Sequence, residues 1–259
     1  MKMTAELEPL RTRVIDIARA AGRCVMEIHA RTTIDVRIKA DASPVTLADE
    51  QAHALITERL AALTPDIVIV SEEAAAPTHP CAPDGCFWLV DPLDGTKEFI
   101  RRNGEFTVNI ALIDDGRPVL GVVFAPALDQ MYSGVAGSAA WLDDVHGRLA
   151  LACRRAPAEG LTVIASRSHG DTGALDAFLS RRKVAQRREA GSSLKLCLIA
   201  AGEADVYPRF GRTMEWDIAA GHAVLGAAGG RVELTDGSPL RYGKPGFENP
   251  HFIAWGLRD

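Results

Sequence analysis

Apolar residues recur with two different periods along the chain, and these periods separate the expected helices from the expected strands. Apolar positions at helical spacing predict amphipathic helices over residues 9–29 and 47–63. Short apolar runs bounded by turn residues predict buried strands at residues 67–70, 87–90, 107–113 and 119–124. Two further strands are predicted at residues 34–38 and 131–141. The first half is therefore expected to be an α+β unit.

The pattern changes after residue 150, where helices and strands alternate more regularly. Strands are expected at residues 161–165, 184–189, 204–207 and 252–255, and helices at residues 171–182, 192–201 and 217–228. Such alternation is typical of α/β folds. We therefore expect an N-terminal α+β subdomain over residues 1–150 and a C-terminal α/β subdomain over residues 151–259.

The apolar run at residues 87–90 ends in two aspartates, Asp91 and Asp94. Charges at the edge of a core are costly unless they are paired or bind a metal. Two carboxylates and a free backbone carbonyl, such as that of Leu93, are the oxygen ligands that Mg²⁺ takes. A plain turn with capping aspartates stays an alternative here, because Asp and Pro are common turn residues.

Other acids occupy similar places, and each has an ordinary structural explanation when taken alone. Glu72 follows the predicted strand at residues 67–70. Asp217 is a candidate N-cap of its helix, and Asp49 lies in a first turn, where it favours the helix dipole. Taken together with Asp91 and Asp94, Glu72 and Asp217 supply enough ligands for two Mg²⁺ ions that share a phosphate.

Composition and charge remove several classes of protein from consideration. The 259 residues carry a net charge of −5, which gives no general attraction for nucleic acid or membrane surfaces. No run of 18 apolar residues occurs, so we expect no transmembrane helix, and the N-terminus has no apolar signal region. Five cysteines without a Cys-x-x-Cys pair favour neither a disulfide framework nor a zinc site. They favour a reducing cytoplasm.

Three short motifs resemble those of a known family. The run DPLDGT at Asp91–Thr96 resembles the D-P-[IL]-D-G-T signature of the inositol monophosphatase superfamily of Mg²⁺-dependent, lithium-sensitive phosphatases. The run WDIAAG at residues 216–221 resembles its second signature, and Ser71-Glu72-Glu73 resembles its G-E-E segment with Ser in place of Gly. The resemblance covers roughly residues 10–255 and implies the layered αβαβα sugar-phosphatase fold.

The resemblance also implies a role for each matching position. Glu72, Asp91 and the Leu93 carbonyl would hold one Mg²⁺, and Asp91, Asp94 and Asp217 a second, with a third, weaker ion near Glu72. Thr96, hydrogen-bonded to Asp49, would orient and help deprotonate the attacking water. The catalytic residues implied are Asp49, Glu72 and Thr96.

Other segments narrow the resemblance to the 3′(2′),5′-bisphosphate nucleotidases, which convert adenosine 3′,5′-bisphosphate to AMP and phosphate. These segments are KEFIRRNGEFTV at residues 97–108, GSSLK at 191–195 and YPRF at 207–210. Ser192 and Lys195 are expected on one face of the helix at 192–201, with Ser192 near an N-terminus that suits phosphate. The substrate-binding residues implied are Glu72, Leu93, Asp94, Gly95, Thr96, His169, Ser192, Lys195, Arg209 and Asp217.

Three alternatives stay open at this point. One is a sibling phosphatase that acts on inositol phosphate, fructose bisphosphate or histidinol phosphate. Another is a phospho-ligand sensor without activity, which the complete set of metal ligands disfavours. A nucleic-acid-binding protein is supported only by a basic cluster, for which a solvated surface is the better interpretation: Arg181, Arg182, Arg187 and Arg188. Monomer and homodimer are both open, and peripheral association with the inner membrane is an expectation from resemblance alone.

Overall fold

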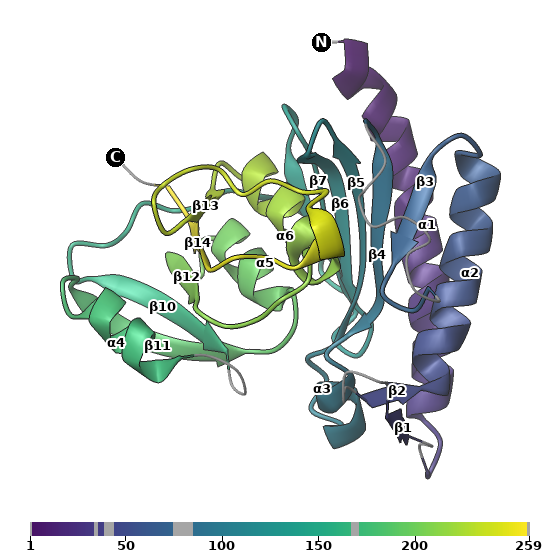
Figure 1. Ribbon diagram of the computed structural model, residues 1–259, viewed down its shortest axis with the longest axis horizontal. Helices are drawn as coiled ribbons and strands as arrows, with labels where there is room; N and C mark the ends of the chain where they lie inside the picture. Colours follow the sequence, from purple (N-terminus) through teal and green to yellow (C-terminus); the bar gives the residue numbers. More distant parts are fainter. Residues whose placement is uncertain (1, 34–35, 39–43, 75–84, 167–170, 258–259) are drawn as a thin grey trace.

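The residues that the computed structural model describes are 2–33, 36–38, 44–74, 85–166 and 171–257, and they form alternating layers (Figure 1). The order of the layers is helix, sheet, helix, sheet, helix. This order confirms the expected αβαβα arrangement.

The larger sheet has seven strands in the order β3-β4-β5-β6-β7-β8-β9. Strands β3 and β4 are parallel, and the other neighbours are antiparallel. Helices α1 (Lys2–His29) and α2 (Leu47–Leu63) cover one face. The strands are β3 (Val68–Ser71), β4 (Phe87–Asp94), β5 (Thr107–Asp114), β6 (Arg117–Ala125), β7 (Gln130–Val135), β8 (Ala140–Asp144) and β9 (Gly147–Leu151).

The smaller sheet has five strands in the order β11-β10-β12-β14-β13. Helices α5 (Leu194–Ala200) and α6 (Glu215–Ala227) lie between the two sheets, and α4 (Thr172–Leu179) covers the outer face of the smaller one. Its strands are β10 (Leu161–Ser166), β11 (Val184–Ala190), β12 (Val206–Arg209), β13 (Arg231–Leu234) and β14 (Phe252–Trp255). The remaining elements are β1 (Val36–Ile38), β2 (Pro44–Thr46), α3 (Thr96–Arg101) and a 3-10 turn at Pro245–Phe247.

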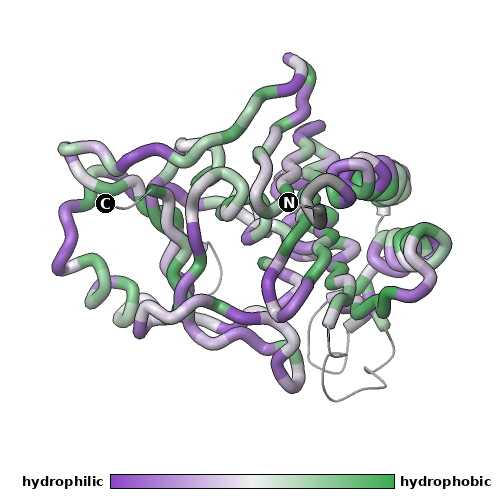
Figure 2. The backbone as a smooth tube through the Cα atoms, turned by 90° about the horizontal axis from the view of Figure 1, so that it is seen from above, coloured by the Kyte–Doolittle hydropathy of each residue, from purple (hydrophilic) through white to green (hydrophobic). Residues whose placement is uncertain are grey.

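Strand β4 is apolar at every position from Phe87 to Val90 because both of its faces are buried. Trp88 and Val90 pack with α1 and α2, while Phe87 and Leu89 pack with α6. A strand covered on both sides has no solvent-facing positions to alternate with. The covering helices have only one buried face, so those at the right of Figure 2 carry both hydrophobic and hydrophilic colours.

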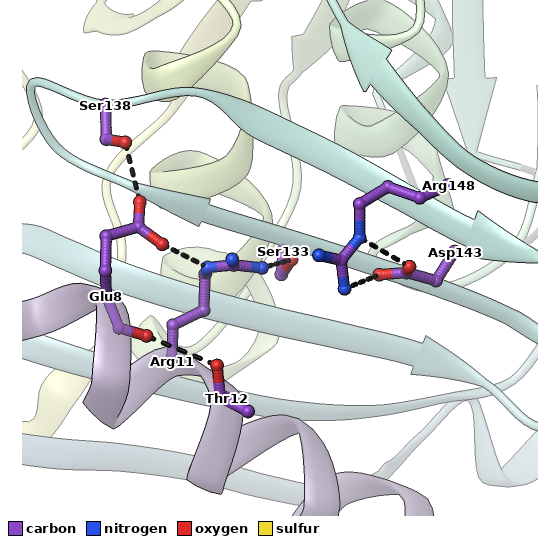
Figure 3. A network of polar contacts seen from close by, with 7 residues as sticks. All are labelled: Glu8, Arg11, Thr12, Ser133, Ser138, Asp143 and Arg148. Atoms are coloured by element: carbon purple, nitrogen blue, oxygen red, sulfur yellow. Dashed lines mark hydrogen bonds and ion pairs between the residues drawn. The ribbon is translucent and has the colours of Figure 1, made fainter.

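Helix α1 begins at Lys2, seven residues before the expected start, and continues through Pro9. A network of side chains ties this first part of the helix to the sheet (Figure 3). Arg11 is almost fully buried, and its guanidinium donates to Glu8 Oε2 at 2.9 Å and to Ser133 Oγ at 3.0 Å. Glu8 also accepts from Ser138 Oγ at 2.6 Å. These contacts offset the cost of a proline inside the helix.

Several elements differ from the predictions. Residues 131–141 form two strands, β7 and β8, rather than one, with Gly137 at φ +75° in the turn between them. Strands β2, β9 and β13 and helix α3 were not predicted. β9 is an edge strand whose first four residues are exposed, so it lacks an apolar pattern. The strand expected at residues 34–38 is present as β1, and residues 34–35 lie outside the described part.

The chain passes from the larger sheet to the smaller one between Leu151 and Leu161. Helix α6, from the second half, nevertheless packs on β4, β5, β6 and β7 of the first sheet. The division into subdomains 1–150 and 151–259 stays a prediction. No helix in the part of the chain that the structure describes is both long enough and apolar enough to span a bilayer.

Candidate active site

A bulge at the end of β4 places two aspartates on one face of the larger sheet. The strand continues to Asp94, past the expected end at Val90, and between Asp91 and Asp94 it has two residues where its partner β5 has only Val108. Asp91 lies opposite Asn109 and Asp94 opposite Thr107. Since Asn109 and Thr107 are two residues apart, they share a face, and so do their partners. Asn109 Nδ2 accordingly donates to Asp94 Oδ2 at 3.4 Å.

Three carboxylates from three elements meet at this bulge. Oxygen atoms of Glu72, Asp91 and Asp217 all lie within 4.8 Å of one another. Glu72 follows β3, whose parallel pairing sets Ser71 opposite Val90. Asp217 lies in the first turn of α6, where its Oδ2 accepts from Met214 N at 2.8 Å. The expected N-cap role of Asp217 is wrong, because Met214 is the N-cap and the helix begins at Glu215, but Asp217 still caps the helix from its third position and lies in the acidic cluster.

The cluster carries more negative charge than its surroundings compensate. Burial, followed by the charges of Glu72 and Asp94, raises the pKa of Asp91 well above its usual range. Burial and the charge of Asp94 raise the pKa of Asp217 in the same way. A divalent cation removes such repulsion. Because the donors are oxygen atoms, the cluster fits a hard cation such as Mg²⁺.

The predicted pair of Asp49 and Thr96 is formed. Thr96 Oγ1 lies 3.2 Å from Asp49 Oδ1 and 3.3 Å from the Leu93 carbonyl, either of which can accept its proton. Asp49 is buried at the start of α2, and its Oδ2 accepts from both Thr46 N and Thr46 Oγ1, at 2.8 Å and 2.6 Å. This capping box fixes the carboxylate. Gly95, at φ +90°, makes the turn that brings Thr96 toward it.

A cavity of about 370 Å³ opens over the acidic cluster. Its size suits a small-molecule ligand. Asp49 lies behind Thr96 rather than in the lining, and His169 lies outside the described residues. The predicted site residues that line the cavity are Glu72, Asp91, Leu93, Asp94, Gly95, Thr96, Ser192, Lys195, Arg209 and Asp217.

Ser192 does not lie on a helix, which corrects the expected helix at 192–201. Helix α5 begins at Leu194 and has seven residues, and Ser192 precedes it at φ +50°. Ser192 Oγ contacts Thr107 and donates to Asp94 Oδ2 at 2.6 Å, so the hydroxyl faces the acidic cluster. The arguments from a shared helix face and from a helix N-terminus are therefore wrong for this residue.

Of the basic residues that line the cavity, Lys195 and Arg209 are buried beside the acids. Lys195 is buried and donates to the Ser192 carbonyl at 2.6 Å. Burial lowers the pKa of Lys195 to about 8, and the charge of Asp94 opposes that effect. Arg209, in β12, is also buried, and its Nη2 donates to the Arg212 carbonyl at 2.8 Å. The cavity therefore combines a metal-binding end with fixed positive charge.

Several residues of the site were missed at the level of sequence. Asn109 donates to Ser193 Oγ at 2.9 Å, and Ser193 Oγ donates to the Asp217 carbonyl at 2.5 Å. A buried Asn inside the apolar run 107–113 was the available signal. Lys97 and Glu98 line the cavity, while Phe99 is buried against His29 and Phe106. Tyr207, Arg212 and Thr213 complete this part of the lining.

A family model described as the inositol monophosphatase family matches residues 6–255. The chain belongs to that family. Within it, the chain is 48% identical to the Escherichia coli K12 protein named 3′(2′),5′-bisphosphate nucleotidase CysQ, over 92% of this chain and 96% of that protein. A Buchnera aphidicola protein of the same name is 42% identical over 95% and 93%.

Solved structures agree with this membership of the inositol monophosphatase family. A crystal structure of CysQ from Bacteroides thetaiotaomicron superposes with a TM-score of 0.82 at 36% identity, over 97% of this chain and 98% of that chain. An IMPase from Thermotoga maritima superposes with a TM-score of 0.76 at 26% identity, over 93% and 90%.

Proposed function

We propose that this protein is a Mg²⁺-dependent 3′(2′),5′-bisphosphate nucleotidase that hydrolyses the 3′-phosphate of adenosine 3′,5′-bisphosphate to give AMP and phosphate. One observation carries the proposal: a single cavity joins an acidic cluster to the buried cations Lys195 and Arg209. A substrate with two phosphates needs both. The 42–49% identity to proteins named CysQ supports the choice of substrate over inositol phosphate.

The residues around the acidic cluster would hold the cations and the reacting phosphate. Glu72, Asp91 and the Leu93 carbonyl would bind one ion, and Asp91, Asp94 and Asp217 another; a third, weaker ion near Glu72 is part of the proposal. When bound, such ions neutralise phosphate charge and lower the pKa of water. Gly95, which lines the cavity beside these acids, would contact the phosphate through its backbone.

Thr96 and Asp49 would position the attacking water. The Thr96 hydroxyl donates to one acceptor at a time, so donation to Asp49 would leave its oxygen able to accept from a water in the cavity. A water that donated to Thr96 Oγ1 would be held beside the acidic cluster, and its proton could pass through Thr96 toward Asp49. Lys195 and Arg209 would bind the phosphate that does not react. Ser192 would act through Asp94, whose orientation its hydrogen bond fixes.

The cellular location and the partners that we propose are supported by the cysteines and the surface arginines. Four cysteines in the described part of the chain, Cys24, Cys86, Cys153 and Cys197, are free thiols, which fits a reducing cytoplasm. Arg187 pairs with Asp176 and Arg188 with Glu203 at the surface, so these arginines support no nucleic-acid partner. A homodimer stays a prediction from resemblance.

The test is phosphate release from adenosine 3′,5′-bisphosphate, inositol 1-phosphate and fructose bisphosphate, with and without Mg²⁺. We expect the nucleotide to be the best substrate, no turnover without Mg²⁺, and inhibition by millimolar lithium. Faster turnover of inositol 1-phosphate would instead identify a sibling phosphatase.

A variant of the acidic cluster separates catalysis from a binding-only role. Asp94→Asn should lower kcat by about 100-fold or more, because the change removes an anionic ligand of the cation that would stabilise the transition state. Asp115→Asn, the same change in the exposed turn after β5, is the matched control and should keep full activity. Circular dichroism of both variants should match the wild type. An active Asp94→Asn variant would overturn the proposed roles.

A further inference from the structure

A histidine on α2 contacts the end of the strand that carries Glu72. His53 Nδ1 lies 2.8 Å from Ser71 Oγ, and Ser71 is buried. Burial lowers the pKa of His53, so its ring is neutral at neutral pH and can make this bond in either tautomer. The pair links the first helix layer to the residue directly before a proposed metal ligand.

Helix α2 thereby reaches the active site at two points. His53 is four residues after Asp49, so the two side chains lie on the same face of the helix. Asp49 contacts Thr96, the proposed water-positioning residue, and His53 contacts Ser71. One rigid element therefore supports both the water side and the metal side of the site.

The backbone around Glu72 is held on one side by the sheet. Glu72 N donates to the Val90 carbonyl at 3.1 Å, and Ala74 N donates to the Ser71 carbonyl at 3.1 Å, which forms a turn. The Ser71–His53 bond is a side-chain restraint on the same turn. The family motif has glycine at the position of Ser71, and glycine can make no such bond.

We infer that His53 is a positioning residue for Glu72. Through its bond to Ser71, His53 holds the turn in the geometry that the metal requires. It does not touch substrate or the reacting atoms. Residues that hydrogen-bond to metal ligands and orient them typically contribute 10- to 100-fold to metal affinity or activity. Because His53 acts through one further residue, its removal should cost about 10-fold in Mg²⁺ affinity, at the lower end of that range.

The test compares His53→Ala, His53→Asn and Ser71→Ala with the wild type. The asparagine amide can occupy the place of Nδ1 and should restore most of the lost affinity. Two readouts are needed: the Mg²⁺ concentration for half-maximal activity, and the Mg²⁺-induced increase in Tm, which requires no turnover. His146→Ala, on an exposed turn, is the matched control.

We expect His53→Ala and Ser71→Ala each to raise both Mg²⁺ midpoints by about 10-fold, and the double variant to add little, since the two residues act as one unit. A lower Tm in EDTA with unchanged Mg²⁺ midpoints would show a purely structural role and overturn the inference. The inference rests on the proposed Mg²⁺-dependent function. The Mg²⁺ response of the wild type tests that function separately.

Discussion

The charge of Lys195 should change within the pH range in which the enzyme can be assayed. Its pKa of about 8 means that the ammonium loses its proton as the pH rises through that value. An uncharged amine binds phosphate less well. We therefore expect the KM for adenosine 3′,5′-bisphosphate to increase above about pH 8, by about 10-fold, which corresponds to one hydrogen bond between charged groups.

Variants show whether Lys195 is the group responsible. Lys195→Gln should have a high KM throughout the range from about pH 7 to about pH 9.5, without this increase. Lys183→Gln, which changes an exposed lysine, should behave as the wild type. A wild-type KM that is flat across pH 8 would contradict the proposed contact between Lys195 and phosphate.

The acidic cluster gives a second pH dependence, which concerns stability and the binding of a cation rather than of phosphate. The folded-state pKa values of Asp91 and Asp217 lie above the unfolded value of about 3.9. The folded protein therefore binds more protons in the interval between these values, and this contribution to stability is lost as the pH rises through it. Mg²⁺ competes with those protons, so its stabilising effect should increase with pH.

Calorimetry with EDTA or Mg²⁺ tests this linkage. At a Mg²⁺ concentration about 100 times its Kd, the stabilisation should reach about 2.7 kcal/mol. The Mg²⁺-induced increase in Tm should be larger at pH 8 than at pH 6 and nearly absent in Asp91→Asn. An equal increase in the wild type and in Asp91→Asn would exclude Asp91 as a ligand.

Residues of the site differ in how far the sequence predicts them. Asp91 and Asp94 stand out because charge follows an apolar run, and Thr46 with Asp49 has a recognisable capping pattern. Asn109 stands out as a polar residue inside an apolar run, but a single such residue does not indicate which partners it has. The left-handed conformation of Ser192 is imposed by its contacts with Asp94 and Thr107. Nothing local in the sequence indicates it.

At the scale of elements, the contact between α6 and the larger sheet decides where Asp217 lies. The helix crosses β6 at Gly121, where an added Cβ would lie 2.3 Å from the Ala220 carbonyl oxygen. Gly121→Ala should therefore push α6 outward. We expect a loss of about 1–3 kcal/mol in the free energy of unfolding, and a lower kcat because Asp217 moves with the helix.

A glycine of α6 that faces away from the larger sheet supplies the control. Gly226 is exposed, and an added Cβ there meets no atom within 4 Å. Gly226→Ala should stabilise the protein by up to about 1 kcal/mol and leave kcat unchanged. Urea denaturation and steady-state kinetics measure both variants. Equal stability of Gly121→Ala and the wild type would contradict this expectation, because it would mean that α6 can move away from β6 at no cost.

Elements with a clear periodicity of apolar residues were predicted well. Elements whose first and last residues depend on tertiary packing were not. Helix α2 agrees with its predicted bounds because a capping box marks its start. The turn between β7 and β8 was missed because small residues on both sides conceal it. Helix α3 was missed because its six residues are too short for a period, and its formation depends on burial of Phe99 between His29 and Phe106.

At the scale of the whole molecule, one core joins the two predicted subdomains. Leu89 and Ala111 of the larger sheet pack in the same cluster as Ala220 and Val224 of α6. Neither half can bury this surface alone. We therefore expect a single cooperative unfolding transition, with calorimetric and van't Hoff enthalpies that agree.

Fragments extend that test of cooperativity. The fragment 1–150 should lack cooperative unfolding by circular dichroism, since one face of its sheet would be exposed. Two separate transitions in the full chain, or a folded fragment, would show that the subdomains are independent. The layered order was predicted from family resemblance. Apolar periods alone do not specify which element covers the second face of a sheet.

The extra residue in β4 has a consequence for how this site tolerates change. Two aspartates spaced two apart in a regular strand would already share a face. At the bulge the Leu93 carbonyl accepts from the Thr96 hydroxyl, and we propose that this backbone oxygen is a third donor to the ion. That donor is specified by the length of the segment and not by the identity of its side chain. Leu93→Ile should therefore be nearly silent, whereas inserting or deleting one residue between Asp91 and Asp94 should destroy the site.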